Sequence, residues 1–443
     1  MNTPVHSGAG GTEVTDAADL STLSSDRQVS AFDRWLGARV QARVTPASVR
    51  IRLWDGQPLP GAPERPVADL LIRDRVTLLR LIYRADFWFG EAYMAGRALV
   101  LGDLNTTIEA LTARASSVEP NVFDQIVAKL ALPNTLSRAR NNVHEHYDLG
   151  NDFYRLWLDR EMLYTCAYFP TESATLEEAQ EAKMDLVCRK LHLQPGETVA
   201  EAGCGWGALA LFMARRYGVK VKAFNVSKEQ LAWARERAQR EGLAGQVEFI
   251  DDDYRNISGQ FDVFVSVGML EHVGLRRYPA LGQVIRRVLK RDGGRGLLHF
   301  IGRDIPRPLN AWIDHRIFPG AYPPTLAEVT TRVMKPAGMS VVDVDNLRLH
   351  YARTLEHWAD RYARSRDQVR AMFDESFARA WELYLAGSRA AFVSGSLQLF
   401  QVVFTAIAAR PPYWTREVVY GPTDRPRDGG GARDESHGPP VGA

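Results

Sequence analysis

The sequence predicts an α/β protein with a doubly wound, mostly parallel sheet, preceded by a smaller α+β domain. Three observations support this fold class. From about residue 137, short apolar strands alternate with amphipathic helices, as in a parallel sheet with helices on both faces. A glycine-rich turn follows the first of these strands. Residues 27–135 mix short strands and helices without that alternation, which indicates a separate domain.

The larger domain shows strands and helices in regular succession. Strands are expected at Thr198–Ala202, 219–224, 247–250, 261–267 and 296–301. The first two strands are followed by expected helices at Ala208–Tyr217 and 229–240. Ser227 and Gln230 have the spacing of a capping box at the start of the second helix. Towards the C-terminus, apolar spacing predicts a helix over 368–386, followed by an apolar run at 397–409.

The smaller domain is expected over residues 27–135. Residues 49–54 alternate at period two like a strand, and residues 76–83 and 104–111 have helical apolar spacing. The segment 87–94 is dense in aromatic side chains. We interpret it as core packing, with a lipid-docking surface as the alternative. Residues 1–26 and 421–443 carry few large apolar side chains and are expected to be disordered.

Composition and charge narrow the class of protein. The 443 residues are 45% hydrophobic and 24% charged, with a formal net charge of +2, which is typical of a globular protein and gives no argument for nucleic-acid binding. The basic cluster at 286–291 is interpreted as a solvated helix face. Three cysteines do not make a disulfide framework, so a reducing cytoplasm is expected. No apolar stretch reaches the roughly 18 residues of a spanning helix, so a membrane would be contacted from its aqueous side.

The glycine-rich turn is the first motif that carries chemistry. It reads EAGCGWG over residues 201–207, and glycines at a strand-to-helix turn let the backbone approach a ligand closely. The spacing G-x-G-x-G, with no Lys-Ser/Thr ending, differs from dinucleotide and phosphate loops. The acidic Glu201 suits the amino group of an amino-acid-like cofactor. A tight structural turn is the alternative explanation for this motif alone.

The motifs around this turn resemble those of the cyclopropane-fatty-acid synthase family, which includes the mycolic-acid cyclopropane synthases. The resemblance extends in order from about residue 35 to 415. The motifs that carry it are EAYM (91–94), HYDLGNDFY (146–154), YTCAYF (164–169), GCGWG (203–207), DYR (253–255), SVGMLEHVG (266–274), FPG (318–320) and HYARTL (350–355).

The resemblance implies a Rossmann-like S-adenosylmethionine-dependent methyltransferase domain at 136–420, joined by a helical linker to a lipid-facing domain at 27–135. It implies transfer of a methylene group to the cis double bond of an unsaturated phospholipid acyl chain, which becomes a cyclopropane ring. The residues implied in S-adenosyl-L-methionine binding are Tyr164, Thr165, Glu201, Gly203, Cys204, Gly205, Trp206, Gly207, Asn225, Gln230 and Tyr254. Those that match the family's bicarbonate pocket, beside the reacting carbon, are Cys166, Glu271, His299, Ile301 and Tyr351.

The chemistry of an alkene acceptor explains why such a pocket is needed. Methyl transfer to a double bond leaves a carbocation, from which water must be excluded. A base then removes a proton from the new methyl group and the ring closes. Bicarbonate would serve as that base, with His299 and the Cys166 backbone donating to it and Glu271 orienting its hydroxyl. By residue type alone, His299 would be a core histidine, Glu271 half of a surface Glu–His pair, and Cys166 apolar packing.

Some positions depart from the family pattern. Thr165 replaces the usual serine and Asn225 a common threonine, and both keep a hydrogen-bonding group. The loop 318–325 also differs, and it is expected to border the acyl channel. Ser388 stands where many members carry a cysteine; the mechanism needs no nucleophile there, so Ser388 is not counted as catalytic. No recognisable metal-ligand spacing is present.

Three alternatives remain open. The same methyl transfer could end in a methylene-branched acyl chain, which a partner reductase would convert to a methyl branch. A small-molecule methyltransferase would share only the cofactor turn. A catalytically inactive lipid-binding protein would be expected to lack Glu271, Tyr351 or the glycine turn, and none is missing. The expected partner is a membrane phospholipid contacted peripherally from the cytoplasm, and the N-terminal domain could support a homodimer.

Overall fold

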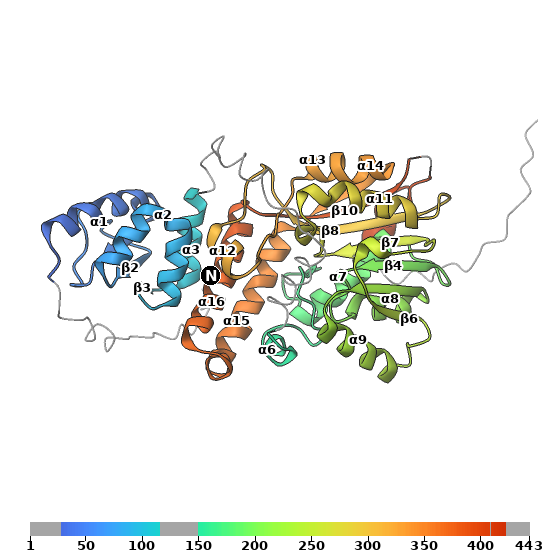
Figure 1. The fold of residues 1–443 in the computed structure, drawn as a ribbon, viewed down its shortest axis with the longest axis horizontal. Helices are drawn as coiled ribbons and strands as arrows, with labels where there is room; N and C mark the ends of the chain where they lie inside the picture. Colours follow the sequence, from blue (N-terminus) through green and yellow to red (C-terminus); the bar gives the residue numbers. More distant parts are fainter. Residues whose placement is uncertain (1–27, 116–148, 408, 422–443) are drawn as a thin grey trace, which may run out of the picture.

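The computed structural model describes residues 28–115, 149–407 and 409–421 and shows an N-terminal unit packed against a larger α/β unit (Figure 1). The expected disorder of the two ends and the expected helical linker concern residues outside these ranges, apart from Gly421. The domain boundary placed at residue 135 also lies outside them, so it stays a prediction. In the described ranges, no helix is both long enough and apolar enough to cross a membrane.

The N-terminal unit is an α+β structure built on a three-stranded sheet. The sheet has the order β1-β2-β3, with β1 parallel to β2 and β3 antiparallel to it. The elements are α1 (Ala31–Val44), η2 (Thr45–Ala47), β1 (Val49–Arg52), β2 (Ala68–Ile72), α2 (Arg75–Met94), β3 (Ala98–Leu101) and α3 (Leu104–Ala115). The strand expected at 49–54 and the helices expected at 76–83 and 104–111 are confirmed, although α2 continues to Met94.

The larger unit is built on a seven-stranded sheet with the order β6-β5-β4-β7-β8-β10-β9. Its strands are β4 (Thr198–Ala202), β5 (Lys220–Asn225), β6 (Val247–Asp251), β7 (Val263–Val267), β8 (Arg295–Gly302), β9 (Met339–Asn346) and β10 (Gln398–Ala406). The first five pair in parallel, and β10 is antiparallel to β8 and β9. This confirms the predicted doubly wound, mostly parallel sheet, and the apolar run expected at 397–409 becomes β10.

Helices cover both faces of this sheet because strand side chains alternate between two apolar layers. Val199 and Val263 pack in one layer, while the adjacent Ala200 and Phe264 pack in the other. The helices and short turns are α6 (Asn151–Arg155), α7 (Leu176–Lys190), α8 (Ala208–Tyr217), α9 (Lys228–Arg240), η3 (Tyr254–Asn256), α10 (Leu270–Val273), η4 (Leu275–Arg277), α11 (Tyr278–Val288), α12 (Ala311–Arg316), α13 (Leu326–Val329), η5 (Thr330–Met334), α14 (Lys335–Ala337), α15 (Arg348–Met372), α16 (Glu375–Ser394) and α17 (Glu417–Tyr420).

The single helix predicted over 368–386 is wrong. The chain forms α15 and α16 instead, with a break at Phe373 and Asp374. The Asp374 carboxylate accepts a hydrogen bond of 2.7 Å from the backbone N–H of Phe377, so it caps a new helix. Apolar spacing continues through the break, which is why periodicity alone did not reveal it.

Helix α16 joins the two units. It lies against α15 on one side and against α2 and α3 of the N-terminal unit on the other (Figure 1). In the aromatic segment 87–94, Phe87, Phe89 and Tyr93 pack against the apolar cluster that contains α16. The packing interpretation is therefore confirmed. Phe89 also packs against the core of the smaller unit, so the segment contributes both to that core and to the contact between the units.

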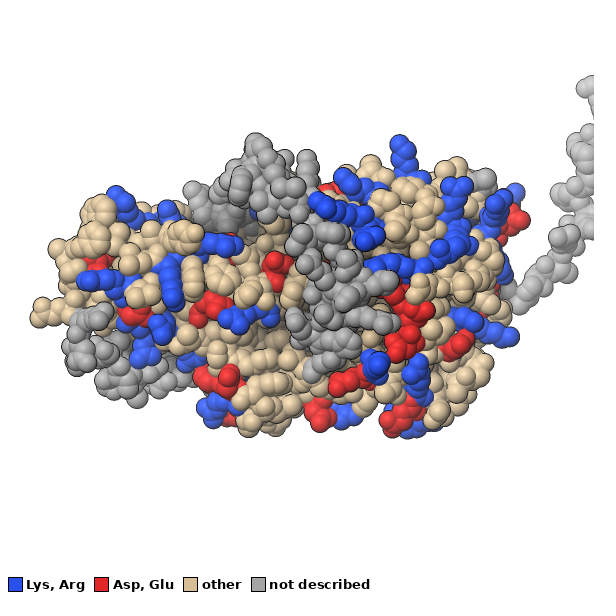
Figure 2. All heavy atoms as spheres, viewed as in Figure 1, with Lys and Arg blue, Asp and Glu red and all other residues tan. Residues whose placement is uncertain are grey.

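Surface charge is mixed. Figure 2 shows basic side chains gathered over the region of α11 and α14, with acidic and basic residues interspersed elsewhere on this face. Arg286 and Arg287 occupy the exposed face of α11, as the interpretation of a solvated helix face requires. The three cysteines are free and buried.

Candidate active site

Two cavities meet inside the molecule. The first, of about 160 Å³, lies at the carboxyl ends of β4, β5 and β7, the position where doubly wound sheets bind ligands. The second, of about 690 Å³, extends from there towards the N-terminal unit. Four residues line both cavities, namely Tyr164, Thr165, Gly268 and His272. These four residues form the boundary that the two cavities share, which we call the neck.

The glycine turn shapes the first cavity. Gly203, Gly205 and Gly207 have φ angles of 83°, 53° and 83°, which favour glycine at each position. A Cβ on Gly207 would lie 2.6 Å from the Phe249 ring, whereas one on Gly205 would meet no atom within 4 Å. Gly207 therefore serves packing, and Gly205 leaves backbone open to a ligand in the cavity.

A buried carboxylate and a buried ammonium face this cavity. Glu201 lies one residue before the end of β4, and burial raises the pKa of its carboxyl to about 8. Among the described residues, its Oε2 atom has no hydrogen-bond partner. Burial also lowers the pKa of Lys183 on α7 to about 8, and its Nζ atom donates to Oγ1 of Thr165 at 2.8 Å. An unpartnered carboxylate fits the ammonium group of an amino-acid-like cofactor.

Asn225 and Gln230 form a hydrogen-bonded pair beside the turn. Nδ2 of Asn225 donates to Oε1 of Gln230 at 2.8 Å and to the Gly205 carbonyl at 3.2 Å. Ser227 caps α9 as expected, but the Gln230 side chain turns to Asn225 rather than back to the Ser227 backbone, so the reciprocal capping box is wrong. Asn225, on β5, therefore contacts the turn directly, and Gln230, on α9, fixes the orientation of the Asn225 amide.

Aromatic residues complete the first cavity. Tyr254 lies in η3 and is buried. Trp206 is buried in the turn and donates from Nε1 to Oδ1 of Asn151 at 2.7 Å, which joins the 146–154 motif to the site. Every residue predicted to bind the cofactor lines this cavity except Gly207. Cys204 is buried, with its Sγ atom 3.8 Å from the Gly205 carbonyl.

All five residues predicted for the catalytic pocket line the second cavity. Glu271 lies in α10, and its Oε1 atom accepts a short hydrogen bond from the backbone N–H of Ile301. Its Oε2 atom is buried and has no hydrogen-bond partner in the described part of the chain. Burial raises the pKa of this carboxyl to about 7. Ile301 thus acts through its backbone, by fixing one oxygen and leaving the other for a ligand.

His299 is held by a chain of buried polar groups. Lys190 pairs with Asp345 and donates from Nζ to Oε1 of Gln401 at 2.6 Å. The amide nitrogen of Gln401 lies 3.0 Å from Nδ1 of His299. Since an ammonium group only donates, the Gln401 oxygen must face Lys190, and its N–H₂ group must donate to Nδ1.

The proton of the imidazole therefore sits on Nε2. Burial holds the pKa of His299 well below its usual range, so the ring is neutral. Nε2 is buried without a partner among the described residues. Among the buried polar atoms of the second cavity that the described residues leave unsatisfied are a donor, Nε2–H of His299, and an acceptor, Oε2 of Glu271.

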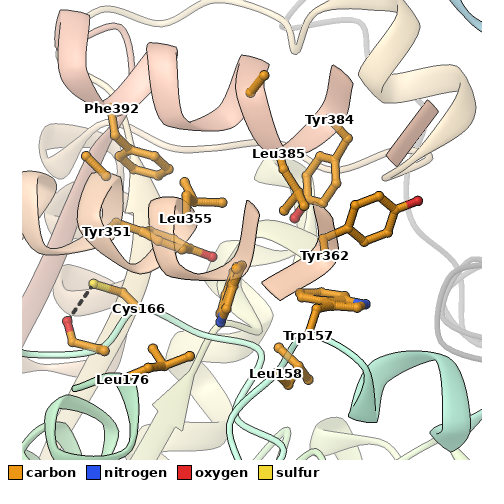
Figure 3. Close-up of a cluster of buried hydrophobic side chains, with 14 of the residues drawn as sticks. Trp157, Leu158, Cys166, Leu176, Tyr351, Leu355, Tyr362, Tyr384, Leu385 and Phe392 are labelled. Carbon is orange, nitrogen blue, oxygen red and sulfur yellow. Dashed lines mark hydrogen bonds between the residues drawn. The ribbon is translucent and has the colours of Figure 1, made fainter. Parts of the chain in front are cut away.

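Cys166 and Tyr351 belong to the wall of the cavity. Burial raises the pKa of the Cys166 thiol, which donates to the Ala167 carbonyl at 3.1 Å, so this residue is not a nucleophile at neutral pH. The Tyr351 ring lies 4.5 Å from the Phe392 ring. Figure 3 shows Tyr351 between Cys166 and Phe392.

Aromatic side chains surround the neck. The hydroxyl groups of Tyr164 and Tyr384 are 2.6 Å apart. The Tyr164 ring also lies 5.2 Å from Trp157 and 5.3 Å from Trp358. Of these rings, Tyr164 and Tyr384 line the second cavity, and their π faces suit a cationic centre there, which each stabilises by about 0.5–2 kcal/mol when water is excluded.

The sequence missed two residues of the site, Lys183 and Arg303. Lys183 lies on the buried stripe of α7 among apolar neighbours, and a charged residue on such a stripe was a usable signal. Arg303 follows β8 directly and lines the second cavity. The loop 318–325 borders that cavity as expected, through Phe318, Ala321 and Pro323. In the described ranges, no group of three or more potential ligands could hold a metal ion.

Comparison with known proteins agrees with this geometry. The family model of mycolic acid cyclopropane synthetase matches residues 134–402. A probable fatty acid methyltransferase of Pseudomonas putida is 36% identical over 392 residues, which cover 84% of this chain and 96% of the relative. The cyclopropane-fatty-acyl-phospholipid synthase of Escherichia coli K12 is 35% identical over 343 residues, covering 76% and 88%. The crystal structure of the mycolic acid cyclopropane synthase CmaA1 in complex with SAH and CTAB has a TM-score of 0.56 and 31% identity, covering 60% and 97%.

Proposed function

Since this chain belongs to the mycolic acid cyclopropane synthetase family and is an S-adenosylmethionine-dependent methyltransferase acting on lipids, we propose that its acceptor is the cis double bond of an unsaturated phospholipid acyl chain, which becomes a cyclopropane ring. One observation carries this proposal. The cofactor cavity shares the neck with a much larger cavity, and His299 and Glu271, each with a buried atom that has no partner among the described residues, line that larger cavity.

The walls of the second cavity favour a hydrocarbon acceptor over a small polar one. The methyltransferase unit contributes Leu355, Leu383 and Leu399, and the N-terminal unit contributes Leu81 and Ile108. Such walls bind an apolar chain by excluding water from it. The double bond would lie at the neck, where Thr165 and Gly268 approach so closely that a Cβ on Gly268 would lie 2.9 Å from the Thr165 methyl group.

The residues of the first cavity fit S-adenosylmethionine. Glu201 offers its unpartnered carboxylate to the cofactor's ammonium group, and Gly205 leaves room for close approach of the backbone. When bound, the cofactor supplies an electrophilic methyl group. The protein's contribution is to align that group with the double bond through the neck and to keep water away from both.

The second cavity would stabilise the cation and provide for removal of the proton. Transfer of the methyl group breaks the π bond and leaves a positive charge on the neighbouring carbon, which the rings of Tyr164 and Tyr351 face from the wall. His299 can donate from Nε2 and Glu271 can accept at Oε2. This pair fits bicarbonate, which supplies a base when bound. Loss of one proton from the new methyl group then lets its electron pair close the ring.

A second outcome has one observation in its favour. The relative from Pseudomonas putida is named a probable fatty acid methyltransferase. In that case a hydride would first shift from the methylated carbon to the neighbouring cationic carbon, and the new methyl group would then lose a proton to leave a methylene branch, which a partner reductase would convert to a methyl branch. The cofactor site and the His299–Glu271 pair serve both outcomes, which differ in whether that hydride shift comes before the proton is lost.

The phospholipid would be reached at a membrane surface. Exposed apolar side chains gather on α1 and α2, namely Phe32, Trp35, Val76, Leu79 and Tyr83, and we call them the α1–α2 patch. The Arg75–Asp33 ion pair of 2.6 Å joins the two helices beside Phe32 and Val76, so the two halves of the patch adjoin. Contact with the bilayer would be peripheral and from the cytoplasmic side.

The proposal is tested in a bacterial host that lacks its own synthase, expresses this chain and is fed methyl-labelled methionine. Chromatography of the fatty acids against standards separates cyclopropane from methylene-branched products of equal mass. A labelled cyclopropane acid supports the proposal, and a labelled branched acid supports the second outcome. No label in lipid, with the protein folded and binding S-adenosylmethionine, overturns both.

A further inference from the structure

Arg303 is a buried arginine with no carboxylate partner among the described residues. Its side chain is 7% exposed. Nη1 donates to the backbone carbonyls of Arg307 and Pro308, at 3.3 and 2.8 Å. The Nε atom is buried and has no hydrogen-bond partner in the described ranges. A guanidinium without a counterion is costly to bury, so this arrangement indicates a ligand that supplies negative charge.

Arg303 lies on the same face of the β8 segment as two residues of the proposed reaction site. His299, Ile301 and Arg303 follow one another at every second position along β8 and just beyond its end, so their side chains share one face. All three line the second cavity. Arg303 is four positions after His299, which in an extended chain places their Cα atoms about 13 Å apart. A lipid whose mid-chain double bond lies near His299 needs a separation of this order to its head group.

Arg303 also lies just below the molecular surface. The next two residues, Asp304 and Ile305, are exposed. Arg307 lines the same cavity, and Nη1 of Arg303 donates to its backbone carbonyl, so two neighbouring arginines belong to the wall of an otherwise largely apolar space. The electrostatics agree with this geometry, because burial and the nearby Arg307 lower the pKa of Arg303 to about 10.

We propose that Arg303, supported by Arg307, binds the phosphodiester of the phospholipid whose acyl chain fills the second cavity. The planar fork of a guanidinium matches two phosphate oxygens, and its free Nε–H supplies one of the two donors. The assignment rests on the proposed acyl substrate and adds the group that orients it. A phosphate held here sets how far the chain extends towards His299, and so which carbon reaches the neck.

The test compares binding of two mono-oleoyl lipids, one with a phosphodiester-linked glycerol head group and one without it. Oleoyl-lysophosphatidylglycerol and mono-oleoylglycerol are each titrated against the full chain by equilibrium dialysis, together with oleate as a carboxylate. The wild-type protein is expected to bind the lysophospholipid at least about tenfold more tightly than the neutral lipid, as charge-assisted hydrogen bonds predict. Arg303→Gln is expected to abolish that preference without weakening the neutral lipid, and Arg303→Lys to restore part of it.

Controls separate this site from a structural role. Arg291→Gln removes an exposed arginine in a turn away from the cavity and should leave the preference intact. Equal weakening of both lipids by Arg303→Gln would mean that Arg303 only supports its own loop, and would overturn the proposal. No preference in the wild type, or an Arg303-dependent preference for oleate, would also overturn it.

Failure of this site and failure of the proposed function are distinguishable. Ligand binding needs no turnover, so an Arg303-dependent phosphate preference stands even if the labelled-methionine experiment finds no label in lipid. Conversely, if label appears in lipid but Arg303→Gln leaves the phosphate preference unchanged, the proposed function stands and the proposed Arg303 site is refuted.

Discussion

Gln401 donates a hydrogen bond of 3.0 Å to Nδ1 of His299, and this contact determines which nitrogen of the imidazole carries the proton. Lys190 fixes the orientation of the Gln401 amide by donating to its oxygen at 2.6 Å. The result is a neutral ring whose Nε2–H has no partner among the described residues, in a cavity that Glu271, with its unpartnered Oε2 atom, also lines. A donor and an acceptor placed in this way are suited to hold a small oxyacid beside the reacting carbon.

Gln401→Glu is expected to reverse the tautomer of His299. A carboxylate accepts from Nδ1–H, which leaves Nε2 without its proton and turned into an acceptor. Turnover should fall by about 10²- to 10⁴-fold, the range seen when a catalytic histidine is held in the wrong tautomer. Cofactor affinity, measured by calorimetry, should not change. Gln283→Glu, at an exposed position on α11, is the control, and near-normal turnover in Gln401→Glu would contradict the assigned tautomer.

Glu271→Gln is expected to lower turnover by about 10²- to 10⁴-fold, as loss of a group that positions a catalytic base does. Cofactor affinity should be retained, because Glu271 lines only the second cavity. Loss of cofactor binding in this variant would show that Glu271 acts in the first cavity instead.

The same variant should change how stability depends on pH. The pKa of Glu271 is raised to about 7 in the folded state, above about 4.3 in the unfolded chain. The charged form is therefore disfavoured by folding, and wild-type stability falls as pH rises between these values. Relative to wild type, Glu271→Gln should gain on the order of 3 kcal/mol in the free energy of unfolding by pH 8 and little at pH 4. Denaturant titration checks this, with the exposed Glu356→Gln as a control that should show no such gain.

Gly205→Val is expected to weaken cofactor binding by at least about tenfold, because a side chain there points into open cavity space at a φ angle of 53°. Gly242→Val is a matched control, since Gly242 has a φ of 69° and also meets no atom within 4 Å, but it lies outside the cavity. Both variants should lose similar stability in thermal unfolding. Equal cofactor affinity in the two variants would refute the role of the turn.

Leu81→Trp is expected to shorten the acyl chains that are modified. Leu81 belongs to α2 of the N-terminal unit but lines the second cavity, so a larger side chain fills the space available to the chain. Leu101→Trp, on the same unit and outside the cavity, is the control. Chromatography of products from a mixture of acyl lengths measures the shift, and an unchanged distribution would show that the acyl chain does not reach this unit.

The double variant Trp35→Ser/Tyr83→Ser is expected to reduce sedimentation with phosphatidylglycerol vesicles by several-fold, because both side chains belong to the α1–α2 patch. Trp414→Ser removes an even more exposed tryptophan from the other unit and should have no effect. If Trp414→Ser lowers vesicle binding and the double variant does not, the membrane contact lies on the larger unit.

The sequence predicted the features that depend on local pattern. The strand that ends at Ala202, the glycine turn and α8 follow from alternation and from the need for glycine at positive φ. The order of strands and helices along the sequence was sufficient to predict a doubly wound sheet. Apart from Gly207, the residues matched to the family's two pockets line two adjoining cavities, although they are distant along the chain.

Contacts across the sheet could not be predicted in this way. Gln401 meets His299 because β10 lies antiparallel to β8, with these two residues in register. The role of Arg303 depends on a cavity shared by two units, which no single segment encodes. The break between α15 and α16 depends on one capping aspartate within a continuous apolar pattern.

The central claim is that the acceptor is the mid-chain double bond of a phospholipid. The most direct measurement incubates the purified chain with dioleoyl phosphatidylglycerol vesicles and S-adenosylmethionine carrying a fully deuterated methyl group, then identifies the fatty acids by chromatography and mass spectrometry. The account predicts a cyclopropane acid that has lost one deuterium from that methyl group, because ring closure removes one of its hydrogens. Unmodified acyl chains, with methylation of an added soluble amine or hydroxyl acceptor instead, would contradict it.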